Sequence, residues 1–577
     1  MIINKQMRHV FAAFFTLFST VIFSQNSDSE KLKLLIAKYE NFKPYDINLY
    51  PLGDFSEDRF EKEFNFFNAT LNEINGLSPL NLTDNEKLTR NLLIFILDEK
   101  INSYNYKLRY NPILSDSGFH NSLVYYVKPL LNKKDAINYL NLLKSVPLFV
   151  DQNINLIQKG INLGISQPKI IFKGYEASYN RHITKDFSNN YYYTPFKELS
   201  TRINKHERDS IIIAGKNLIN ESIIPSFKKI KKFFENDYLP KTRDSVSISS
   251  TPNGKEFYQN RINYYTTLEL SPSEIHQIGL NEVSRILNEM QKIIRKIGFE
   301  GDFISFISYL RTDEKFYAKS ARELLMIARD ISKRLDEKLP EFFKTLPRKP
   351  YGVAPVPDAI APKYTGGRYI PSSKKSRTSA YYWVNTYNLN SRPLYTLPAL
   401  SAHEAVPGHH LQIALNEESN ENIPLFRKNL YLSAYGEGWG LYAESLASEM
   451  GIYTTPYEEF GQLTYSMWRA CRLVVDTGIH AFNWSREKAV NYLSDNTALS
   501  IHEINTEIDR YISWPGQALS YKIGELKIKE LRSKSEELLS SRFDIHDFHE
   551  AILKNGTITL PMMEKQVENY INSKLSN

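Results

Sequence analysis

Apolar residues recur at helical spacing along most of the chain. In residues 282–298 they fall every three or four positions, and the run stops at Gly298, a residue typical of helix C-termini. Ser271 and Pro272 lie upstream, with Glu274 two positions later, which predicts a capped helix start. Similar runs occupy residues 137–161, 206–235 and 320–340. The pattern predicts a mainly α-helical protein.

One stretch interrupts this pattern. Residues 339–372 are rich in proline and glycine, which indicates an irregular, extended connection. The next segment, TSAYYWVNTYNL at 378–389, is rich in aromatic and β-branched residues and predicts a small β element before helices resume. We therefore expect an N-terminal helical part at 26–345 and a C-terminal helical part at 346–577, joined in one integrated domain over 26–577.

The first 25 residues have the composition of a secretory signal peptide. Lys5 and Arg8 precede an apolar run from Val10 to Phe23, and small and polar residues follow from Ser24. The run is short for a membrane-spanning helix, which needs about 20 residues. We therefore expect a cleaved signal peptide over residues 1–25 and export to the periplasm or the extracellular space. Stable membrane insertion is not expected.

Composition and charge narrow the class of protein. The 577 residues include 42% hydrophobic and 24% charged residues, a balance typical of globular proteins. With 72 basic and 65 acidic residues the net charge is +7, but no basic stripe with interleaved aromatics exists, so we expect no nucleic-acid partner. The single cysteine, Cys471, excludes an internal disulfide, and no cysteine follows the apolar run to carry a lipid anchor.

The stretch ALSAHEAVPGHHLQ, residues 399–412, holds three of the twelve histidines. His403 and Glu404 begin like the His-Glu-x-x-His signature of zinc proteases, in which two histidines one helical turn apart bind the ion. Two later histidines could complete such a pair. On a regular helix His409 would lie on nearly the opposite face, while His410 would lie on the same face about 10.5 Å further along the axis. Neither position suits an unbroken helix.

Pro407 and Gly408 offer a way to restore the spacing. Proline cannot donate the helical hydrogen bond, and glycine accepts unusual dihedral angles. If this pair loops out as two extra residues, His409 takes the place of the second histidine. The sequence therefore predicts a metal helix with a two-residue insertion, in which His409 faces the ion and His410 turns away.

A third ligand is expected from another segment. Residues 433–451, SAYGEGWGLYAESLASEMG, supply Glu437 and Glu444, two turns apart on one helix face. Three glycines lie around Glu437, and glycine weakens a helix by about 1 kcal/mol relative to alanine. These glycines are Gly436, Gly438 and Gly440. Their presence predicts the close approach of a neighbouring helix.

These motifs resemble a bacterial family known as domain of unknown function 885. HEAVPGHHLQ, EGWGLYAE, DTGIH and PGQALSYKIGELKI look like motifs of that family, as do residues 254–283 and 548–560, so the resemblance covers nearly the whole mature chain. More distantly, the sequence is similar to the all-helical gluzincin zinc peptidases, such as angiotensin-converting enzyme, thimet oligopeptidase and the thermostable carboxypeptidases. The resemblance implies a large helical zinc-peptidase-like fold with a deep central cleft.

The resemblance also implies residue roles. It implies one zinc ion held by three ligands, His403, His409 and Glu437. Glu404 is then the general base, and His410 is the alternative second ligand. Glu444 is the alternative carboxylate, or it orients a ligating histidine. Because related zinc peptidases stabilise the developing oxyanion with a His and a Tyr from the C-terminal half, His480 and Tyr521 are implied as catalytic residues.

Substrate-binding residues are predicted from two segments. Arg472, together with Arg469 and Arg510, could bind a substrate carboxylate, although ion pairs on helix surfaces explain these arginines equally well. The strand at 381–388, directly before the metal helix, could pair with the substrate backbone as an added strand. Asn385 is the most distinctive polar residue of that strand.

These observations favour an exported zinc metallopeptidase, a hydrolase that cleaves oligopeptides by metal-activated water with Glu404 as general base. Two alternatives remain open from the sequence. The same metal and base would serve a non-peptidase zinc amidohydrolase, or the insertion could leave a catalytically inactive helical binding protein. Substrate length, endopeptidase or exopeptidase action and the oligomeric state are left open.

Overall fold

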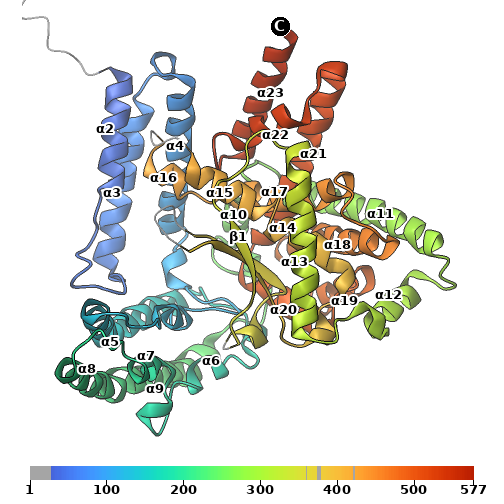
Figure 1. Cartoon of the computed structure of the whole chain (residues 1–577). Helices are drawn as coiled ribbons and strands as arrows, with labels where there is room; N and C mark the ends of the chain where they lie inside the picture. The colour runs from blue at the N-terminus through green and yellow to red at the C-terminus, as the bar shows by residue number, and fades with distance from the viewer. Residues whose placement is uncertain (1–26, 359, 373–377, 420–422, 577) are drawn as a thin grey trace, which may run out of the picture. The chain divides into compact units, whose positions relative to one another are not determined.

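The structure is a computed structural model that describes residues 27–358, 360–372, 378–419 and 423–576. The predicted signal peptide over residues 1–25 lies outside the described residues. Helices dominate the described chain and accompany one three-stranded sheet, which confirms the predicted mainly α fold with a small β element (Figure 1). Among the described residues, each helix is too short or too polar to traverse a lipid bilayer.

The chain divides into two compact units. The smaller unit takes its described residues from 1–44 and 58–101, and the larger unit comprises 45–57 and 102–577. The smaller unit contains α2 (Asp28–Glu40) and nearly all of α3 (Glu57–Asn75) and α4 (Asp84–Asn105), whose first residue and last four residues, respectively, belong to the larger unit. The boundary expected at residue 345 stays a prediction. The candidate chemistry lies in the larger unit.

Helices fill the first part of the larger unit. Their bounds are α5 Lys133–Asn162, α6 Ala177–Asn180, α7 Thr194–Lys197, α8 Lys205–Leu218, α9 Ile224–Phe233, α10 Gly254–Thr266, α11 Pro272–Ile297, α12 Phe303–Thr312 and α13 Ala321–Lys338. The predicted capped helix is α11. The Ser271 side chain and Glu274 form a capping box at its start, and Gly298 ends it with a left-handed φ of 74°.

The sheet follows α13 and has the strand order β1-β3-β2. β3 (Ala380–Val384) pairs in parallel with β1 (Tyr351–Pro355) and antiparallel with β2 (Gly367–Ile370). The prediction of an irregular connection at 339–372 was therefore wrong for two short stretches. Proline and glycine give them little intrinsic strand preference, and pairing with β3 supplies their backbone hydrogen bonds.

The central position of β3 also corrects a second prediction. Because β3 is hydrogen-bonded along both edges, the strand predicted at 381–388 cannot accept a substrate backbone as an added strand. β2 is an edge strand of this sheet instead. Figure 1 shows the sheet beside α13, with α14 and α15 nearby.

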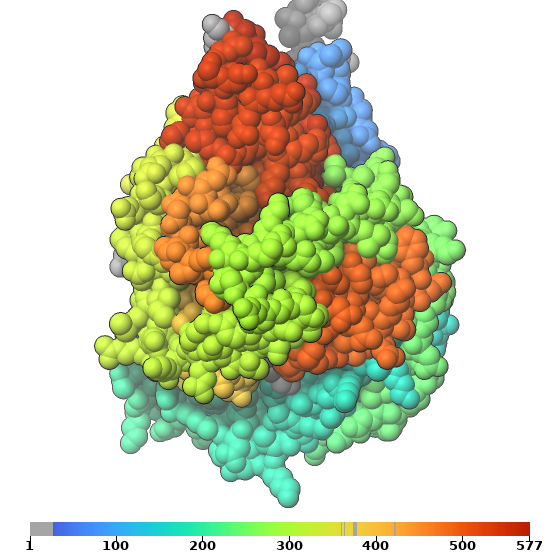
Figure 2. Space-filling model, turned by 90° about the vertical axis from the view of Figure 1, so that its right-hand side faces the viewer, coloured from blue at the N-terminus to red at the C-terminus, as the bar shows by residue number. Residues whose placement is uncertain are grey.

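Helices resume after the sheet and build the rest of the larger unit. Their bounds are α14 Leu397–Glu404, α15 His409–Glu418, α16 Leu425–Lys428, α17 Ser433–Glu449, α18 Pro456–His480, α19 Arg486–Asn496, α20 Ile501–Ser513, α21 Ser520–Leu539, α22 Ile545–Leu553 and α23 Leu560–Ser576. α11 packs along the largely buried α18, and Figure 2 shows α11 and α12 in yellow-green beside orange residues of this part.

Close helix packing accounts for the glycines around Glu437, as predicted. A Cβ atom on Gly438 would lie 2.6 Å from the backbone of Gly524, so α17 and α21 touch through their main chains. A Cβ atom on Gly440 would lie 2.5 Å from the imidazole of His403. These glycines therefore allow α17 to pack closely against both α21 and His403.

Candidate metal centre

Three predicted ligands come together at one point. His403 lies in the last turn of α14, His409 begins α15 and Glu437 lies on α17. Each residue offers one ligand atom, and these atoms lie within 4.8 Å of one another. Glu437 Oε2 is 3.4 Å from His403 Nε2 and 3.6 Å from His409 Nε2. A tetrahedral zinc ion with bonds of about 2.0–2.1 Å separates its ligand atoms by roughly 3.4 Å. The donor set therefore fits one zinc ion, whose binding stays a prediction.

The segment between α14 and α15 sets the position of His409. The Gly408 N–H donates to the Ala402 carbonyl at 2.9 Å, so this hydrogen bond spans six residues where a regular helix spans four. The two additional residues leave the helix as a loop, which contains the cis peptide bond Val406–Pro407. His409 consequently occupies the place of an i+4 residue relative to His403, the arrangement that the sequence suggested.

Two contacts hold this loop in place. A Cβ atom at Gly408 would lie 1.9 Å from the His403 carbonyl oxygen, so the loop closes this tightly only with glycine at that position. The Pro407 carbonyl accepts a hydrogen bond of 2.8 Å from the indole N–H of Trp439, which lies two residues after Glu437. The loop between the two histidines is thereby tied to the helix of the third candidate ligand.

His410 points away from this centre. Its Nδ1 lies 3.2 Å from the Tyr369 hydroxyl, and its ring packs 4.7 Å from the ring of Tyr351. Burial lowers the pKa of His410 to about 4, so the ring is neutral at physiological pH. The alternative in which His410 joins His403 and Glu437 is not the arrangement that the structure shows.

Glu444 orients His403 from the far side of the ring. Its Oε1 lies 2.8 Å from His403 Nδ1, which places the proton on Nδ1 and leaves Nε2 facing Glu437. Burial alone lowers the pKa of His403, but the carboxylates of Glu437 and Glu444 outweigh burial and raise it to about 10. The surroundings of His403 therefore favour positive charge at this point, as a cation site requires.

Tyr431 holds the third candidate ligand, and sequence reasoning missed it. Its hydroxyl donates a hydrogen bond of 2.7 Å to Glu437 Oε1, so Oε2 is the oxygen that faces the two histidines. The missing side chain of Gly436 makes room for the phenol ring, since a Cβ atom there would lie 2.6 Å from it. Gly436 was the one sign of this contact in the sequence.

The carboxylate of Glu404 is held by the edge strand. The Tyr369 N–H of β2 donates a hydrogen bond of 2.7 Å to Glu404 Oε2. Oε1 is left to accept a proton, and the side chain is half-buried beside His403. Sequence reasoning could not identify Tyr369 for this role, because the donor is a backbone N–H that any residue but proline carries.

His480 does not fit the predicted oxyanion role. Its imidazole is buried, with Nδ1 accepting from the Ile248 N–H at 3.1 Å and Nε2 lying 3.0 Å from the Tyr511 carbonyl oxygen, to which it donates. Burial lowers its pKa to about 3. Both ring nitrogens are bonded to backbone, so His480 joins segments of the fold and offers no donor to a substrate.

Tyr521 keeps a free hydroxyl. Tyr521 is the second residue of α21 and is half-buried, and its ring packs 4.4 Å from the guanidinium carbon of Arg472. Among the residues that the structure describes, its hydroxyl has no hydrogen-bond partner. Its predicted role in stabilising the oxyanion stays a prediction.

Arg472 and Asn385 are engaged within the protein. The Arg472 side chain is 3% exposed and donates to the Tyr511 hydroxyl at 2.8 Å and to Glu507 at 3.0 Å. Asn385 is completely buried, and its amide nitrogen donates to backbone carbonyls of residues 361, 364 and 365, while its oxygen accepts from the Tyr387 N–H. The predicted substrate contact of Asn385 is therefore corrected to contacts that hold the fold. Arg472 Nη1 has no hydrogen-bond partner among the described residues, so the substrate contact of Arg472 stays a prediction.

The two other arginines also form contacts within the protein. Arg469 Nη2 lies 3.7 Å from Glu444 Oε1, and Arg510 donates to Gln517 at 2.7 Å.

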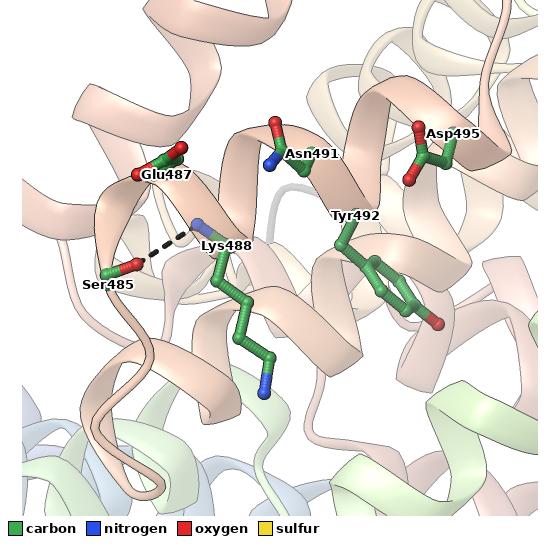
Figure 3. Close-up of a pocket in the computed structure, with 6 residues that line it drawn as sticks. All are labelled: Ser485, Glu487, Lys488, Asn491, Tyr492 and Asp495. Carbon is green, nitrogen blue, oxygen red and sulfur yellow. Dashed lines mark hydrogen bonds between the residues drawn. The ribbon is translucent and has the colours of Figure 1, made fainter.

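A surface hollow lies away from the candidate centre, on α19 and its N-terminal cap, where the Lys488 N–H donates to Ser485 Oγ (Figure 3). This hollow is lined by Ser485, Glu487, Lys488, Asn491, Tyr492 and Asp495 and includes no candidate ligand. The deep central cleft is not confirmed.

Comparison with known protein families and solved structures shows which proteins the chain is similar to. The family model described as "Bacterial protein of unknown function (DUF885)" matches residues 47–567. A solved structure of a "putative lipoprotein" from Colwellia psychrerythraea shares 26% identity with a TM-score of 0.85 over 95% of this chain and 100% of that one. A "putative lipoprotein of unknown function" from Shewanella oneidensis shares the fold at 17% identity, with a TM-score of 0.69 over 94% of this chain and 99% of that one.

No curated protein is significantly similar to the chain. The wider likeness to the gluzincin peptidases stays an expectation. The family match spans most of the chain, including all three candidate ligands and Glu404. The chain therefore belongs to the bacterial DUF885 family.

Proposed function

We propose that the protein is an exported zinc-dependent metallopeptidase that hydrolyses peptide bonds of oligopeptides. The proposal is carried by the convergence of His403, His409 and Glu437, with Glu404 directly after the first of them. Two imidazoles and one carboxylate are a ligand set typical of catalytic zinc, which keeps a further position open for water or substrate. A site built only for structure would close all four positions with protein ligands.

The residues of the chain supply the proton transfers. A zinc ion held by His403, His409 and Glu437 would supply a Lewis acid that polarises a carbonyl group and acidifies water. Glu404 would accept a proton from water through Oε1, because the Tyr369 N–H occupies Oε2. The same carboxyl group then donates the proton to the leaving amine. Tyr521, with its free hydroxyl, remains the proposed donor to the oxyanion.

Export is proposed from two observations. The first 25 residues have the pattern of a signal peptide. Both similar solved structures are of proteins described as putative lipoproteins. We therefore place the peptidase in the periplasm or outside the cell, where short peptides are available as substrates.

The decisive experiment combines metal analysis with one substitution. We expect about one zinc ion per chain and cleavage of peptides from a mixed library. Glu404→Gln should keep the zinc and lower kcat by a factor of about 10² to 10⁴, the usual contribution of a general base. Glu550→Gln is the matched control, because Glu550 also directly follows a histidine, but that histidine, His549, is not one of the three candidate ligands. It should leave kcat unchanged.

Removal of zinc by a chelator should abolish cleavage and lower the melting temperature, since a bound ion stabilises the folded state. A zinc-loaded protein that cleaves small amides but no peptide would identify the amidohydrolase alternative. A protein that takes up no zinc, with a melting temperature insensitive to chelator, would identify the inactive binding protein and refute the proposal.

A further inference from the structure

Arg368 presents a cation beside the candidate centre. It lies on the edge strand β2, one residue before Tyr369, whose N–H donates to Glu404 at 2.7 Å. Gly367 and Tyr369 are buried, whereas Arg368 between them is exposed. The alternation of the strand therefore directs Arg368 to the solvent side, from which a substrate would approach Glu404.

The charge of Arg368 is not neutralised by a close partner. Its side chain shares a hydrogen bond with the Tyr364 hydroxyl, and among the described residues it forms no ion pair. Partial desolvation of the guanidinium lowers the pKa of Arg368, but Tyr364 and the more distant carboxylates of Glu404 and Glu437 outweigh this effect and raise the pKa. Arg368 thus lies within electrostatic reach of the centre and keeps its donors available.

The positive charge of Arg368 has no negative counterpart among the charged groups of the centre. Glu404 and Glu437 together balance a divalent ion, and Glu444 has Arg469 at 3.7 Å. Arg368 would then leave one positive charge without a counterpart at the accessible side. Arg472 differs, because its side chain is 3% exposed and already bonded to Glu507. A guanidinium fork binds carboxylates through two parallel hydrogen bonds.

We propose that Arg368 binds a carboxylate of the peptide substrate, so that peptides with a carboxylate close to the scissile bond are preferred. This inference rests on the proposed peptidase function. The carboxylate has two sources, the free C-terminus of a short peptide or an acidic side chain. Both present the same chemistry to Arg368, and paired substrates separate them.

The test compares matched peptides on the zinc-loaded enzyme. Each peptide is offered as the free acid and as the C-terminal amide, and each acidic residue is exchanged for its amide counterpart. Arg368→Ala should lower kcat/KM about 10- to 100-fold for the substrate that carries the recognised carboxylate, and little for its neutral partner. Arg368→Lys should restore part of the loss. Arg322→Ala removes another exposed arginine, on α13, and should change neither value.

Binding gives a readout that does not depend on turnover. Calorimetry with Glu404→Gln should show the same discrimination between acid and amide, and Arg368→Ala in that background should remove it. Equal losses on charged and neutral substrates, or no loss, would overturn the assignment. If the zinc-loaded enzyme hydrolyses no peptide, the proposed function fails, while calorimetry still decides whether Arg368 recognises a carboxylate.

Discussion

At the scale of single residues, two side chains hold the candidate ligands from behind. Glu444 fixes the tautomer of His403. Tyr431 binds Oε1 of Glu437 and so leaves Oε2 to face the two histidines. Partners of this kind set the orientation and basicity of a ligand without touching the ion. The site is therefore a set of at least five side chains, contributed by α14, α15, α17 and the segment just before α17.

Tyr431→Phe tests this support. It removes the hydrogen bond to Glu437 while keeping the ring, so we expect zinc affinity to fall about 10- to 100-fold in a competition titration with a chelator. Tyr435→Phe serves as the control, since its hydroxyl donates to the Ile552 carbonyl at 3.0 Å and does not contact a candidate ligand. That variant should lose stability and retain zinc affinity. Equal affinity in both variants would show that Tyr431 does not position Glu437.

Asp476 predicts a pH dependence of stability away from the centre. It is completely buried, and it accepts from the Tyr258 hydroxyl at 2.7 Å and from the Gly516 N–H at 3.1 Å. Burial raises its pKa to about 7, against the hydrogen bonds, which lower it. In an unfolded chain the pKa of an aspartate is about 3.9.

The folded state therefore holds the proton more tightly than the unfolded state. The contribution of Asp476 to the free energy of unfolding is greatest below pH 4, falls by about 1.4 kcal/mol per pH unit up to pH 7, and is constant above it. Relative to Asp476→Asn, the wild type should lose roughly 3 kcal/mol between pH 5 and pH 8 in urea unfolding. Parallel pH curves for the two proteins would contradict the expectation.

At the scale of elements, the loop between α14 and α15 decides whether two histidines meet. Gly408→Ala would put a Cβ atom 1.9 Å from the His403 carbonyl and 2.5 Å from that of Ala402. Because both obstacles are backbone, one helix end must move. We expect a loss of about 1–3 kcal/mol in the free energy of unfolding.

The same displacement should weaken zinc binding at least about tenfold, because the ligand atoms must converge within a few tenths of an ångström. Gly366→Ala is the matched control, with its nearest atom, Leu400 Cδ2, at an ordinary 3.9 Å. Thermal melting and zinc titration of the two variants check the prediction. Unchanged zinc affinity in Gly408→Ala would mean that the loop does not set the position of His409.

The elements that could be predicted from the sequence are those whose position depends on residues close to them in the chain. Ser271 and Gly298 act on neighbouring residues, so the ends of α11 could be found from the pattern alone. β1 and β2 were missed because their hydrogen bonds come from pairing with β3, which the residue pattern within β1 and β2 does not show. The Pro-Gly insertion could be inferred because helix geometry allows few ways to place two histidines on one side.

At the scale of the whole molecule, roles that depend on distant contacts escaped prediction. His480 was predicted to contact the substrate by analogy with related peptidases. In the structure its Nδ1 accepts a hydrogen bond from the backbone N–H of Ile248, over 200 residues earlier in the sequence. Asn385 and Arg472 were chosen because they are polar residues near the predicted site, but contacts within the fold use the Asn385 amide and the Nε and Nη2 donors of Arg472. Arg368 was not among the predicted residues, and it lies in a segment that was expected to be irregular. The sequence pattern shows which side chains could act, whereas only packing shows which remain available.

Long-range hydrogen bonds also join the two expected parts of the larger unit. Tyr258 donates to Asp476, and Arg311 donates to the Thr497 carbonyl at 2.9 Å. α18 carries Arg469 beside Glu444 and also receives α11 along its length. The helix that supports the candidate centre therefore depends on residues from before the sheet as well as after it.

The hydrogen bond from Trp439 to the Pro407 carbonyl has an optical consequence. The indole is completely buried on α17, and its N–H reaches the loop that joins the two histidines. Indole emission is sensitive to the hydrogen bonding and polarity around the ring. The chain consequently carries a natural fluorophore, two residues from Glu437, that can report an ion entering or leaving the centre without any label.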